Sequence, residues 1–517
     1  MGRFELNEKY ALLIAVVLFF TLWSIIIIGK FYSLHSYVFD LGFVMERLWQ
    51  PYNIRSFSFY IFVLFSSAFQ LILSPLYFAH SLQLILFIQL FSFTITVYPI
   101  YKVAIMQTGN QKFGLLVSVA YLIYFPSSGI LWFDVHFQAF FIPLFVYAYY
   151  FYLKGKYSYS IILFLISGTV RFPYMILPVI FSFYEIITHF FVNKVESDKK
   201  NELISNTIVF TIGAIFLGGG YYFDVMQSQP TFLSHVSTSL PILIASVVAT
   251  LIIYFGPLLF LPLTKLRWLL LSMPFIALGI ITGSPNYLYP GVMALQYSSM
   301  ILPMVFLGFL DTLANPPHYL IGFKKWLIRG PGLLTTWKNK YMKKGNITNF
   351  AIASVIILLV GSIAYQPYSP VNAYTNENYH FSKDVNFNMT NYKTLEIMVS
   401  LIPKNNPYVL FQNDMPELLP RQSVDSNPFL FSTQISANIT VSEVINNTFP
   451  LLDTATALNH TVFVNVDYLI AFSLSSSYTL RFSPHESSMS QLVSLAIESN
   501  MYQIVKENNG FILLKRI

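Results

Sequence analysis

Long apolar runs recur along the chain, and they constrain its fold more than any other feature. A helix needs roughly 20 apolar residues to cross about 30 Å of hydrocarbon. We identify candidate spans near residues 10–29, 81–101, 113–130, 138–153, 158–170, 172–192, 204–223, 240–262, 268–283, 292–312 and 350–366. Hydrophobic residues make up 55% of the 517 residues and charged residues only 10%, a composition that excludes an ordinary soluble protein. We therefore predict a polytopic membrane protein.

After residue 366 the apolar runs give way to ordinary polar sequence. Strand-like segments cover residues 408–412, 461–466, 468–472, 502–505 and 511–514, and a helical pattern covers residues 489–499. The last two strands flank Asn508-Asn509-Gly510, a sequence typical of a hairpin turn. The predicted fold class is an all-α polytopic membrane domain over residues 1–366, with about eleven transmembrane helices, followed by a small α/β domain over residues 367–517.

Residue types that are missing exclude several functions. The chain has no Cys, so it has no disulfide or thiolate metal site, and any metal must bind oxygen or imidazole. It also lacks the sequence motifs of P-loop ATPases, zinc proteases and serine hydrolases. The net charge is +7, but the basic residues flank apolar runs, where they set topology. We therefore expect no nucleic-acid partner.

The apolar run at residues 56–78 decides which side of the membrane every later loop faces. If it crosses, twelve helices place the C-terminal domain in the cytoplasm; if it lies along or dips into the outer surface, eleven helices place that domain outside. Basic residues favour cytoplasmic loops. With eleven spans, the basic residues before position 367 that fall outside are Lys30, Arg47, Arg55 and Arg171. We therefore predict a multi-pass cell-membrane protein with a cytoplasmic N-terminus, a first outer loop over residues 30–80 and an extracytoplasmic C-terminal domain.

The C-terminal domain also carries sequons for N-glycosylation, at Asn388, Asn438, Asn446 and Asn459. This modification occurs on surface segments that face away from the cytoplasm. The sequons agree with an outer location and predict a glycoprotein. A further sequon at Asn346 would be cytoplasmic and is interpreted as chance.

Ionisable residues gather at the outer ends of the predicted spans, which indicates a polar cavity on that face because charge at membrane depth is costly. Asp40 lies in the first outer loop, ahead of an amphipathic stretch that contains Glu46. A carboxylate there can take a proton from an acceptor hydroxyl, or orient it, together with a divalent metal such as Mg²⁺ or Mn²⁺. Asp40 can equally be the N-cap of the following helix, and the two interpretations are compatible.

Asp134 and His136 form a second candidate group, in a short break between two apolar runs. Residues two apart on an extended backbone face the same side, so both could bind one metal ion or one phosphate. Alternatively, Asp134 fixes the tautomer of His136 or caps the next helix.

Two further side chains are candidates for substrate or phosphate binding. Arg171 lies between two apolar runs, where a guanidinium can clamp a lipid-linked phosphate or reach out to lipid headgroups. Tyr287 is either a substrate contact or part of an aromatic belt at the membrane interface.

Several short motifs occur in an order that resembles one known family. They are Asp40-Leu41-Gly42-Phe43 with Glu46 and Trp49, Phe133-Asp134-Val135-His136-Phe137, Gln296-Tyr297 before a late span, Asp467-Tyr468, and residues 510–516. Together they resemble the domain of unknown function 2079 (DUF2079) family of predicted membrane proteins, over nearly the whole chain. Glu46 and Gln296 stand where that family has Gln and His, and Arg171 lies where it often has an acidic pair.

The DUF2079 family is in turn similar to C-type glycosyltransferases (GT-C), which are polytopic enzymes that use polyprenyl-phosphate sugars. In those enzymes an acidic residue of the first outer loop is the catalytic base or a metal ligand, and surface helices follow in the same loop. The resemblance therefore implies the catalytic role for Asp40 and a second site at Asp134 and His136. It also implies that residues 56–78 do not cross the membrane.

The function expected from these observations is sugar transfer from a polyprenyl-phosphate donor at the outer membrane face. The expected partners are this donor and membrane lipids. We further predict that Asp40, Asp134, His136 and Arg171 converge on one outer-facing cavity. The alternative is a non-catalytic transporter or lipid-binding membrane protein, or a cell-surface scaffold.

Overall fold

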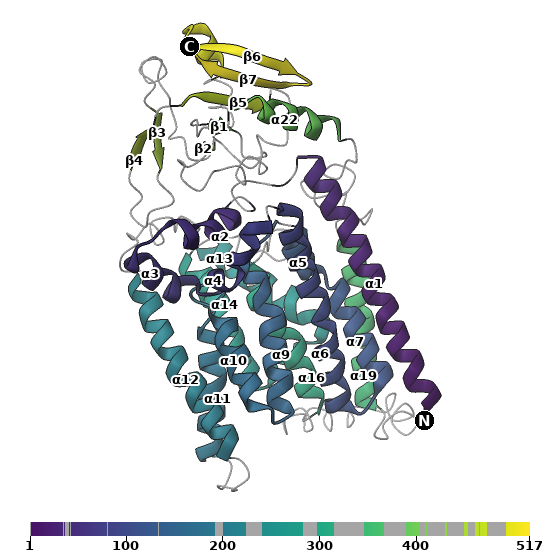
Figure 1. Ribbon diagram of the computed structural model, residues 1–517. Coiled ribbons are helices and arrows are strands. Elements are labelled where there is room, and N and C mark those ends of the chain that lie inside the picture. Colours follow the sequence, from purple (N-terminus) through teal and green to yellow (C-terminus); the bar gives the residue numbers. More distant parts are fainter. Residues whose placement is uncertain are drawn as a thin grey trace.

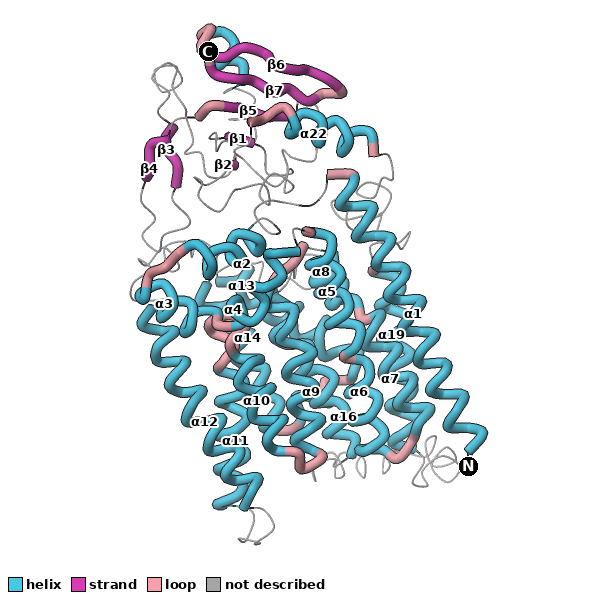
Figure 2. The backbone as a smooth tube through the Cα atoms, in the orientation of Figure 1, coloured by secondary structure: helices cyan, strands magenta, loops and turns pink. Residues whose placement is uncertain are grey.

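The structure of the chain is a computed structural model. It describes residues 2–34, 36, 41, 43–79, 81–132, 134–191, 200–223, 240–282, 297–314, 346–366, 389–403, 409–411, 430–431, 449–452, 461–464, 466–472 and 493–517. Within these residues the helices form one bundle, and the strands gather beyond one end of it (Figures 1 and 2).

Apolar helices build the bundle. They are α1 (Gly2–Tyr32), α5 (Leu82–Ile95), α6 (Val97–Thr108), α7 (Gln111–Ile123), α8 (Phe125–Trp132), α9 (Phe141–Leu153), α10 (Tyr157–Gly168), α11 (Ile176–Phe191), α12 (Lys200–Gly220), α13 (Leu240–Phe255), α14 (Leu266–Thr282), α16 (Leu302–Ala314) and α19 (Asn346–Tyr365). Short 3₁₀ turns η3 (Phe137–Phe140), η7 (Gly256–Leu258) and η8 (Leu261–Thr264) join some of them. This arrangement agrees with the predicted all-α membrane domain.

Five segments of the described chain are helical, long and apolar enough to cross a membrane. They are Glu8–Tyr32, Leu82–Thr108, Lys200–Phe223, Pro241–Leu258 and Tyr297–Ala314, and two bent helix pairs raise the number to seven if each pair is one span. Other apolar helices, such as α10 with 12 residues, reach only about 18 Å at 1.5 Å per residue. The described helices therefore support a membrane protein, whereas the number eleven stays a prediction.

Helix α1 shows how a membrane span exposes apolar side chains outward. Leu18 is 65% exposed and Ile14 is 58% exposed, whereas Trp23 and Ile26 on the inward side are buried. An exposed Leu or Ile would be costly in water but is favourable against lipid tails. The distribution is the one expected of a helix at the edge of a membrane bundle.

The predicted first outer loop, residues 30–80, folds into short helices instead of a straight span in its described part. They are α2 (Phe43–Asn53), α3 (Phe57–Ser67), α4 (Phe69–Leu73) and η2 (Ser74–Ala79). The segment from Phe69 to Ala79 bends by 102° from α3, and the 11 residues of α3 cover only about 16 Å. Figure 1 places α2, α3 and α4 at the end of the bundle that faces the strands. This geometry agrees with the prediction that residues 56–78 do not cross as a regular span.

The C-terminal domain contains a five-stranded mixed sheet in the order β2-β1-β5-β7-β6. Its elements are β1 (Val409–Phe411), β2 (Leu430–Phe431), β5 (Tyr468–Phe472), β6 (Tyr502–Asn508), β7 (Phe511–Arg516) and the helix α22 (Thr390–Ser400), and β3 (Phe449–Leu452) pairs separately with β4 (Thr461–Val464). Strands β1, β2 and β5 are parallel, and β7 pairs antiparallel with β5 and β6. The small α/β domain and its final hairpin agree with the sequence prediction.

Positive φ angles at Asn509 (48°) and Gly510 (84°) make the tight turn between β6 and β7. Asn and Gly tolerate this left-handed backbone better than other residues do. The turn fixes the register in which Asn508 pairs with Phe511. The Asn-Asn-Gly sequence is therefore sufficient to locate the hairpin.

The C-terminal domain contacts the end of α1. Leu34 belongs to the same apolar cluster as Leu395 and Met398 of α22, and the ring of Tyr392 lies 4.9 Å from that of Tyr32, edge on. The sheet therefore lies beyond the end of the bundle opposite the N-terminus (Figure 1). Opposite ends are what an odd number of crossings produces, although the side of the membrane that each end faces stays a prediction. The predicted sequons lie outside the described residues, at Asn388, Asn438, Asn446 and Asn459.

Candidate functional site

The structure describes three of the predicted site residues in full: Asp134, His136 and Arg171. Asp40 and Tyr287 lie outside the described residues. Glu46 lies within α2, but its side chain also falls outside the description. The roles predicted for Asp40, Glu46 and Tyr287 stay predictions.

A glutamine of α5 holds the Asp134–His136 segment in place. The Gln89 amide nitrogen donates to the carbonyl oxygens of Ile130 (3.1 Å) and Asp134 (3.3 Å), and its oxygen accepts from the backbone N–H of His136 (2.8 Å). His136 then occupies the N-cap position of η3 in an extended conformation, without a side-chain cap bond. Asp134 is only 3% exposed. The loop is thus clamped by its backbone, and the His136 ring folds back on it, with Nδ1 3.3 Å from the Asp134 carbonyl oxygen.

Arg171 lies in the turn between α10 and α11, and the α3–α4 segment holds that turn. Three hydrogen bonds join the turn to the break between α3 and α4. They run from Phe69 N to Thr169 O (3.2 Å), from Phe172 N to Ser66 O (2.7 Å) and from Ser67 Oγ to Val170 O (2.9 Å). Because these hydrogen bonds involve the backbone of Val170 and Phe172, on either side of Arg171, they fix the position of the Arg171 backbone.

The same break also contacts the His136 segment. The Phe69 ring packs against the rings of Phe137 (6.3 Å between centroids) and Phe140 (5.3 Å) in η3. The side-chain amide of Gln70 donates to the Arg47 carbonyl oxygen in α2 (2.6 Å). Segments far apart in sequence therefore meet around Phe69 and Gln70. This agrees with a shared outer end for Asp134, His136 and Arg171, whereas their convergence with Asp40 stays a prediction.

A metal ion at this end would need more ligands than Asp134 and His136. Among the described residues, no group of three or more His, Cys, Asp and Glu side chains could hold a metal. A divalent cation with oxygen and imidazole ligands needs at least one more protein donor or several waters. The predicted Mg²⁺ or Mn²⁺ site therefore depends on residues outside the description, of which Asp40 is the candidate.

Lys30, near the end of α1, is a cation that the sequence prediction treated only as a topology signal. It is 5% exposed, its ammonium donates to the Trp132 carbonyl oxygen, and it lies 5.1 Å from the Trp132 ring centroid. Trp132 precedes the Asp134–His136 segment by two residues, so a buried positive charge lies beside that segment. A Lys at a span end usually reaches for headgroups, which is why its burial was not foreseen from the sequence.

A network of buried charges occupies the opposite end of the bundle. Tyr152, a member of this network, is the penultimate residue of α9, and α10 begins five residues after it. The network and Arg171 therefore lie at opposite ends of α10. Asp311 of α16 accepts from Lys265 (2.9 Å), from Arg267 (2.7 Å) and from the Trp268 indole N–H (2.7 Å). Arg267 also pairs with Glu185 of α11. Two cations thus balance two carboxylates.

This network joins helices and does not resemble a binding site. Tyr152 extends it from Glu185 (3.2 Å) to Glu202 of α12 (2.5 Å). Because opposite charges are paired and lie near helix ends, the network locks α9, α11, α12, α14 and α16 together. A transporter site would instead place such groups near the bilayer midplane. The signal for the network was present in the sequence as ionisable residues within apolar runs, but not their pairing.

Comparison with known proteins places the chain in a family. The family described as predicted membrane protein (DUF2079) matches residues 30–513. Comparison with curated protein sequences finds no match. Because the family match covers most of the chain, including the bundle helices after α1 and most of the sheet, the chain belongs to the DUF2079 family, as its motifs predicted.

Proposed function

We propose that this member of the DUF2079 family transfers a sugar from a polyprenyl-phosphate carrier to an acceptor at the membrane face that bears Asp134 and Arg171. The proposal starts from the resemblance of the family to C-type glycosyltransferases. The observation that carries it is the bent first outer loop, whose break at Phe69 contacts both the Arg171 turn and the His136 segment. Such a loop positions side chains from separate helices around one reaction centre.

In the proposed reaction an acceptor hydroxyl oxygen bonds to the anomeric carbon of the sugar while the bond from that carbon to the phosphate oxygen breaks. Asp40 takes the proton of the hydroxyl. The polyprenyl phosphate leaves with an added negative charge, which the Arg171 guanidinium stabilises through paired N–H donors. Glu46 and Tyr287 are proposed substrate contacts.

Three side chains would hold a divalent ion in the proposed site. Asp134 offers a carboxylate and His136 an imidazole, and Asp40 would complete the set. Bound Mg²⁺ or Mn²⁺ would neutralise charge on the phosphate. Without it, Lys30 and Arg171 are two of the cations that the described chain supplies at this end, beside Arg47 and Arg55.

The test is turnover of radiolabelled polyprenyl-phosphate sugars by the purified full-length protein in detergent. We expect wild-type protein to release polyprenyl phosphate, with rates at least 100-fold lower for Asp40→Asn because general-base catalysis contributes about 10²–10⁴-fold. Arg171→Gln should also lower the rate. Glu498→Gln, an exposed carboxylate of the C-terminal domain, is the control and should match wild type.

Two results would contradict the proposal. One is the absence of turnover with every common sugar carrier by folded wild-type protein, which would favour the non-catalytic alternative of a transporter, lipid-binding protein or surface scaffold. The other is turnover that survives Asp40→Asn unchanged. Binding of the lipid-linked sugar without release of polyprenyl phosphate would favour a transporter or lipid-binding protein over a surface scaffold.

A further inference from the structure

Side chains from two other helices of the bundle cap the end of α8. The last carbonyl groups of an α-helix have no donor within the helix, so they need one from elsewhere. The Lys30 ammonium of α1 donates to the carbonyl oxygen of Trp132, the last residue of α8, and the Gln89 amide of α5 donates to that of Ile130 (3.1 Å). Both side chains are buried. Donors within the bundle therefore hold the point at which the Asp134–His136 segment begins.

The partners of Lys30 within the described part of the chain are neutral. Besides the Trp132 carbonyl oxygen, its ammonium faces the Trp132 ring, whose centroid lies 5.1 Å away, within the range of a cation–π interaction. Among the described residues, no carboxylate forms an ion pair with Lys30. The carbonyl end of α8 carries partial negative charge, because the peptide dipoles of a helix are aligned. Lys30 is therefore placed to hold this helix end through both its charge and its hydrogen bond.

Gln89 holds the same segment farther along the chain. Its amide nitrogen also donates to the carbonyl oxygen of Asp134 (3.3 Å), and its oxygen accepts from the backbone N–H of His136 (2.8 Å). Lys30 and Gln89 come from α1 and α5, which pack against each other. Their hydrogen bonds reach every second residue from 130 to 136. The two side chains thus fix the backbone on which both candidate metal ligands stand.

A small shift of this backbone would matter for chemistry. Groups that take part in a reaction must stay close to their productive geometry, and a displacement of about 1 Å caused by a distant change costs about 100-fold in rate. The hydrogen bonds of Lys30 and Gln89 to this segment all go to its backbone. Removing either side chain would therefore displace Asp134 and His136 without removing them.

We propose that Lys30 and Gln89 are positioning residues of the glycosyl-transfer site. This inference rests on the proposed function, and it adds two buried side chains that act on the reaction through the backbone of Asp134 and His136.

The test measures steady-state sugar transfer and thermal stability of purified full-length variants in detergent. Lys30→Met keeps a long side chain but removes the ammonium, and Gln89→Met removes the amide. We expect each to lower kcat about 10- to 100-fold and to change KM for the lipid-linked sugar by no more than about twofold, because the donor still binds while the reacting groups are misplaced. Lys30→Arg should recover most of the lost kcat, since a guanidinium can donate to the same carbonyl oxygen and lie over the same ring.

Gln366→Met is the matched control for a general loss of stability. The buried Gln366 amide donates to the carbonyl oxygen of Ile123, the last residue of α7 (2.7 Å). This variant loses the same kind of bond as Gln89→Met, but just before α8 begins instead of after it ends. It should lower the thermal midpoint and keep the kcat of wild type.

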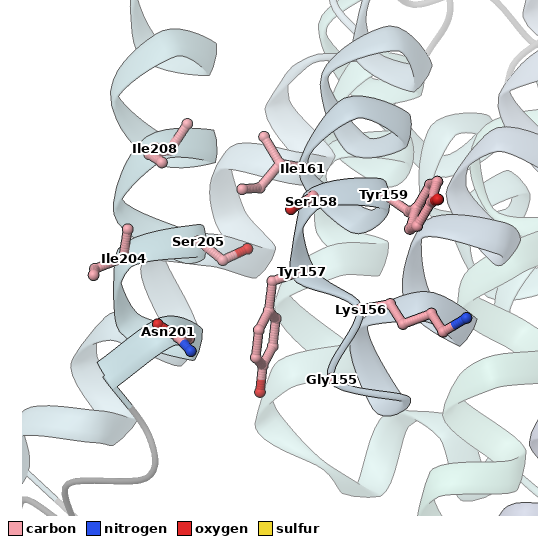
Figure 3. Close-up of a pocket in the computed structure, with 10 residues that line it drawn as sticks. All are labelled: Gly155, Lys156, Tyr157, Ser158, Tyr159, Ile161, Asn201, Ile204, Ser205 and Ile208. Atoms are coloured by element: carbon pink, nitrogen blue, oxygen red, sulfur yellow. The ribbon is translucent and has the colours of Figure 1, made fainter.

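Lys156→Met is the control for the loss of a lysine. Lys156 is exposed and lies beside the cavity of about 580 Å³ between α10 and α12 (Figure 3), at the end of α10 away from Arg171. Its replacement should leave both kcat and the thermal midpoint as in wild type.

A second readout follows the segment itself and does not depend on turnover. Hydrogen–deuterium exchange of the backbone amides of residues 134–140 should become faster in Lys30→Met and Gln89→Met and stay as in wild type in Gln366→Met, because local opening depends on the local contacts. If Lys30→Met does not fold, Gln89→Met tests the same segment from its other side.

Three outcomes would overturn the inference. One is an unchanged kcat in Lys30→Met and Gln89→Met of an active enzyme, which would leave the proposed function intact. Another is a loss of kcat in Gln366→Met as large as theirs, which would show a general effect of stability. The third is unchanged exchange of residues 134–140 in both variants. Folded wild-type protein without turnover would instead contradict the proposed function, and this role with it.

Discussion

Replacing Asp311 by Asn tests whether the buried charge network holds the bundle together. Asp311 is 5% exposed and its carboxylate accepts hydrogen bonds from Lys265, Arg267 and Trp268. Asn keeps the shape of the side chain but removes the negative charge and places an amide N–H₂ beside a cation. The change therefore leaves two cations facing a single remaining carboxylate, that of Glu185.

The expected loss of stability follows from the contacts that remain. Removing one partner of a buried ion pair costs about 3–5 kcal/mol because the other charge stays buried without compensation. Arg267 keeps its pair with Glu185, and the Lys265 ammonium keeps the backbone carbonyl oxygen of Asp311 at 2.7 Å. The Lys265 side chain is also 19% exposed, so water screens part of its charge. We therefore expect about 3 kcal/mol, the lower end of that range.

The measurement is reversible unfolding of the full-length protein in detergent micelles, followed by tryptophan fluorescence, because Trp268 is part of the network. The double variant Asp311→Asn with Lys265→Gln restores equal numbers of cations and carboxylates. It should be more stable than Asp311→Asn alone, and measuring Lys265→Gln as well completes the double-mutant cycle that gives the coupling of the two residues. Glu498→Gln is the control at an exposed carboxylate.

The reasoning would be refuted by a loss below about 0.5 kcal/mol for Asp311→Asn, the range of ordinary surface substitutions. It would also be refuted if the double variant were no more stable than the single variant. Either result would mean that water or a rearranged side chain compensates the charge, and that the network does not join the helices as its geometry indicates.

Two further predictions concern the C-terminal domain and the α10–α11 turn. Tyr502→Phe removes the hydrogen bond to the Val466 carbonyl oxygen (2.7 Å) and should destabilise the domain by about 1–3 kcal/mol in chemical unfolding. Because burial raises the pKa of Tyr502, the stability that this tyrosine contributes is present below about pH 10 and is lost progressively as the pH rises further. Between pH 7 and alkaline pH, the domain should therefore lose less stability in Tyr502→Phe than in wild type. Gly168→Ala would place a Cβ 2.8 Å from the Met175 Cα, and this overpacking should cost about 1–3 kcal/mol and lower the thermal midpoint. Gly218→Ala is the control, because its Cβ would have no atom within 4 Å, and its midpoint should be unchanged or raised. Equal midpoints for the two glycine variants would contradict this packing.

The sequence determined those features that depend on neighbouring residues. Apolar runs predicted a membrane protein, because the cost of burying backbone and side chains in lipid depends on the composition of each segment. Asn508-Asn509-Gly510 located the final hairpin, because a left-handed turn depends on residue type. The distribution of basic residues over the loops before position 367 predicted that residues 56–78 do not cross; the 102° bend is compatible with this, but fits a broken span as well as a re-entrant loop, so the point stays a prediction. The family was also recognisable from short motifs.

Contacts between distant segments came only from the tertiary structure. Lys30 and Trp132 are 102 positions apart, Gln89 and His136 are 47 apart, and Arg267 and Glu185 are 82 apart. Each of these residues has a plausible local interpretation, as a headgroup contact, a polar residue in a span or a topology signal. Their partners are chosen by how the helices pack, since a buried charge or amide must find compensation wherever the fold brings a complementary group within hydrogen-bond distance.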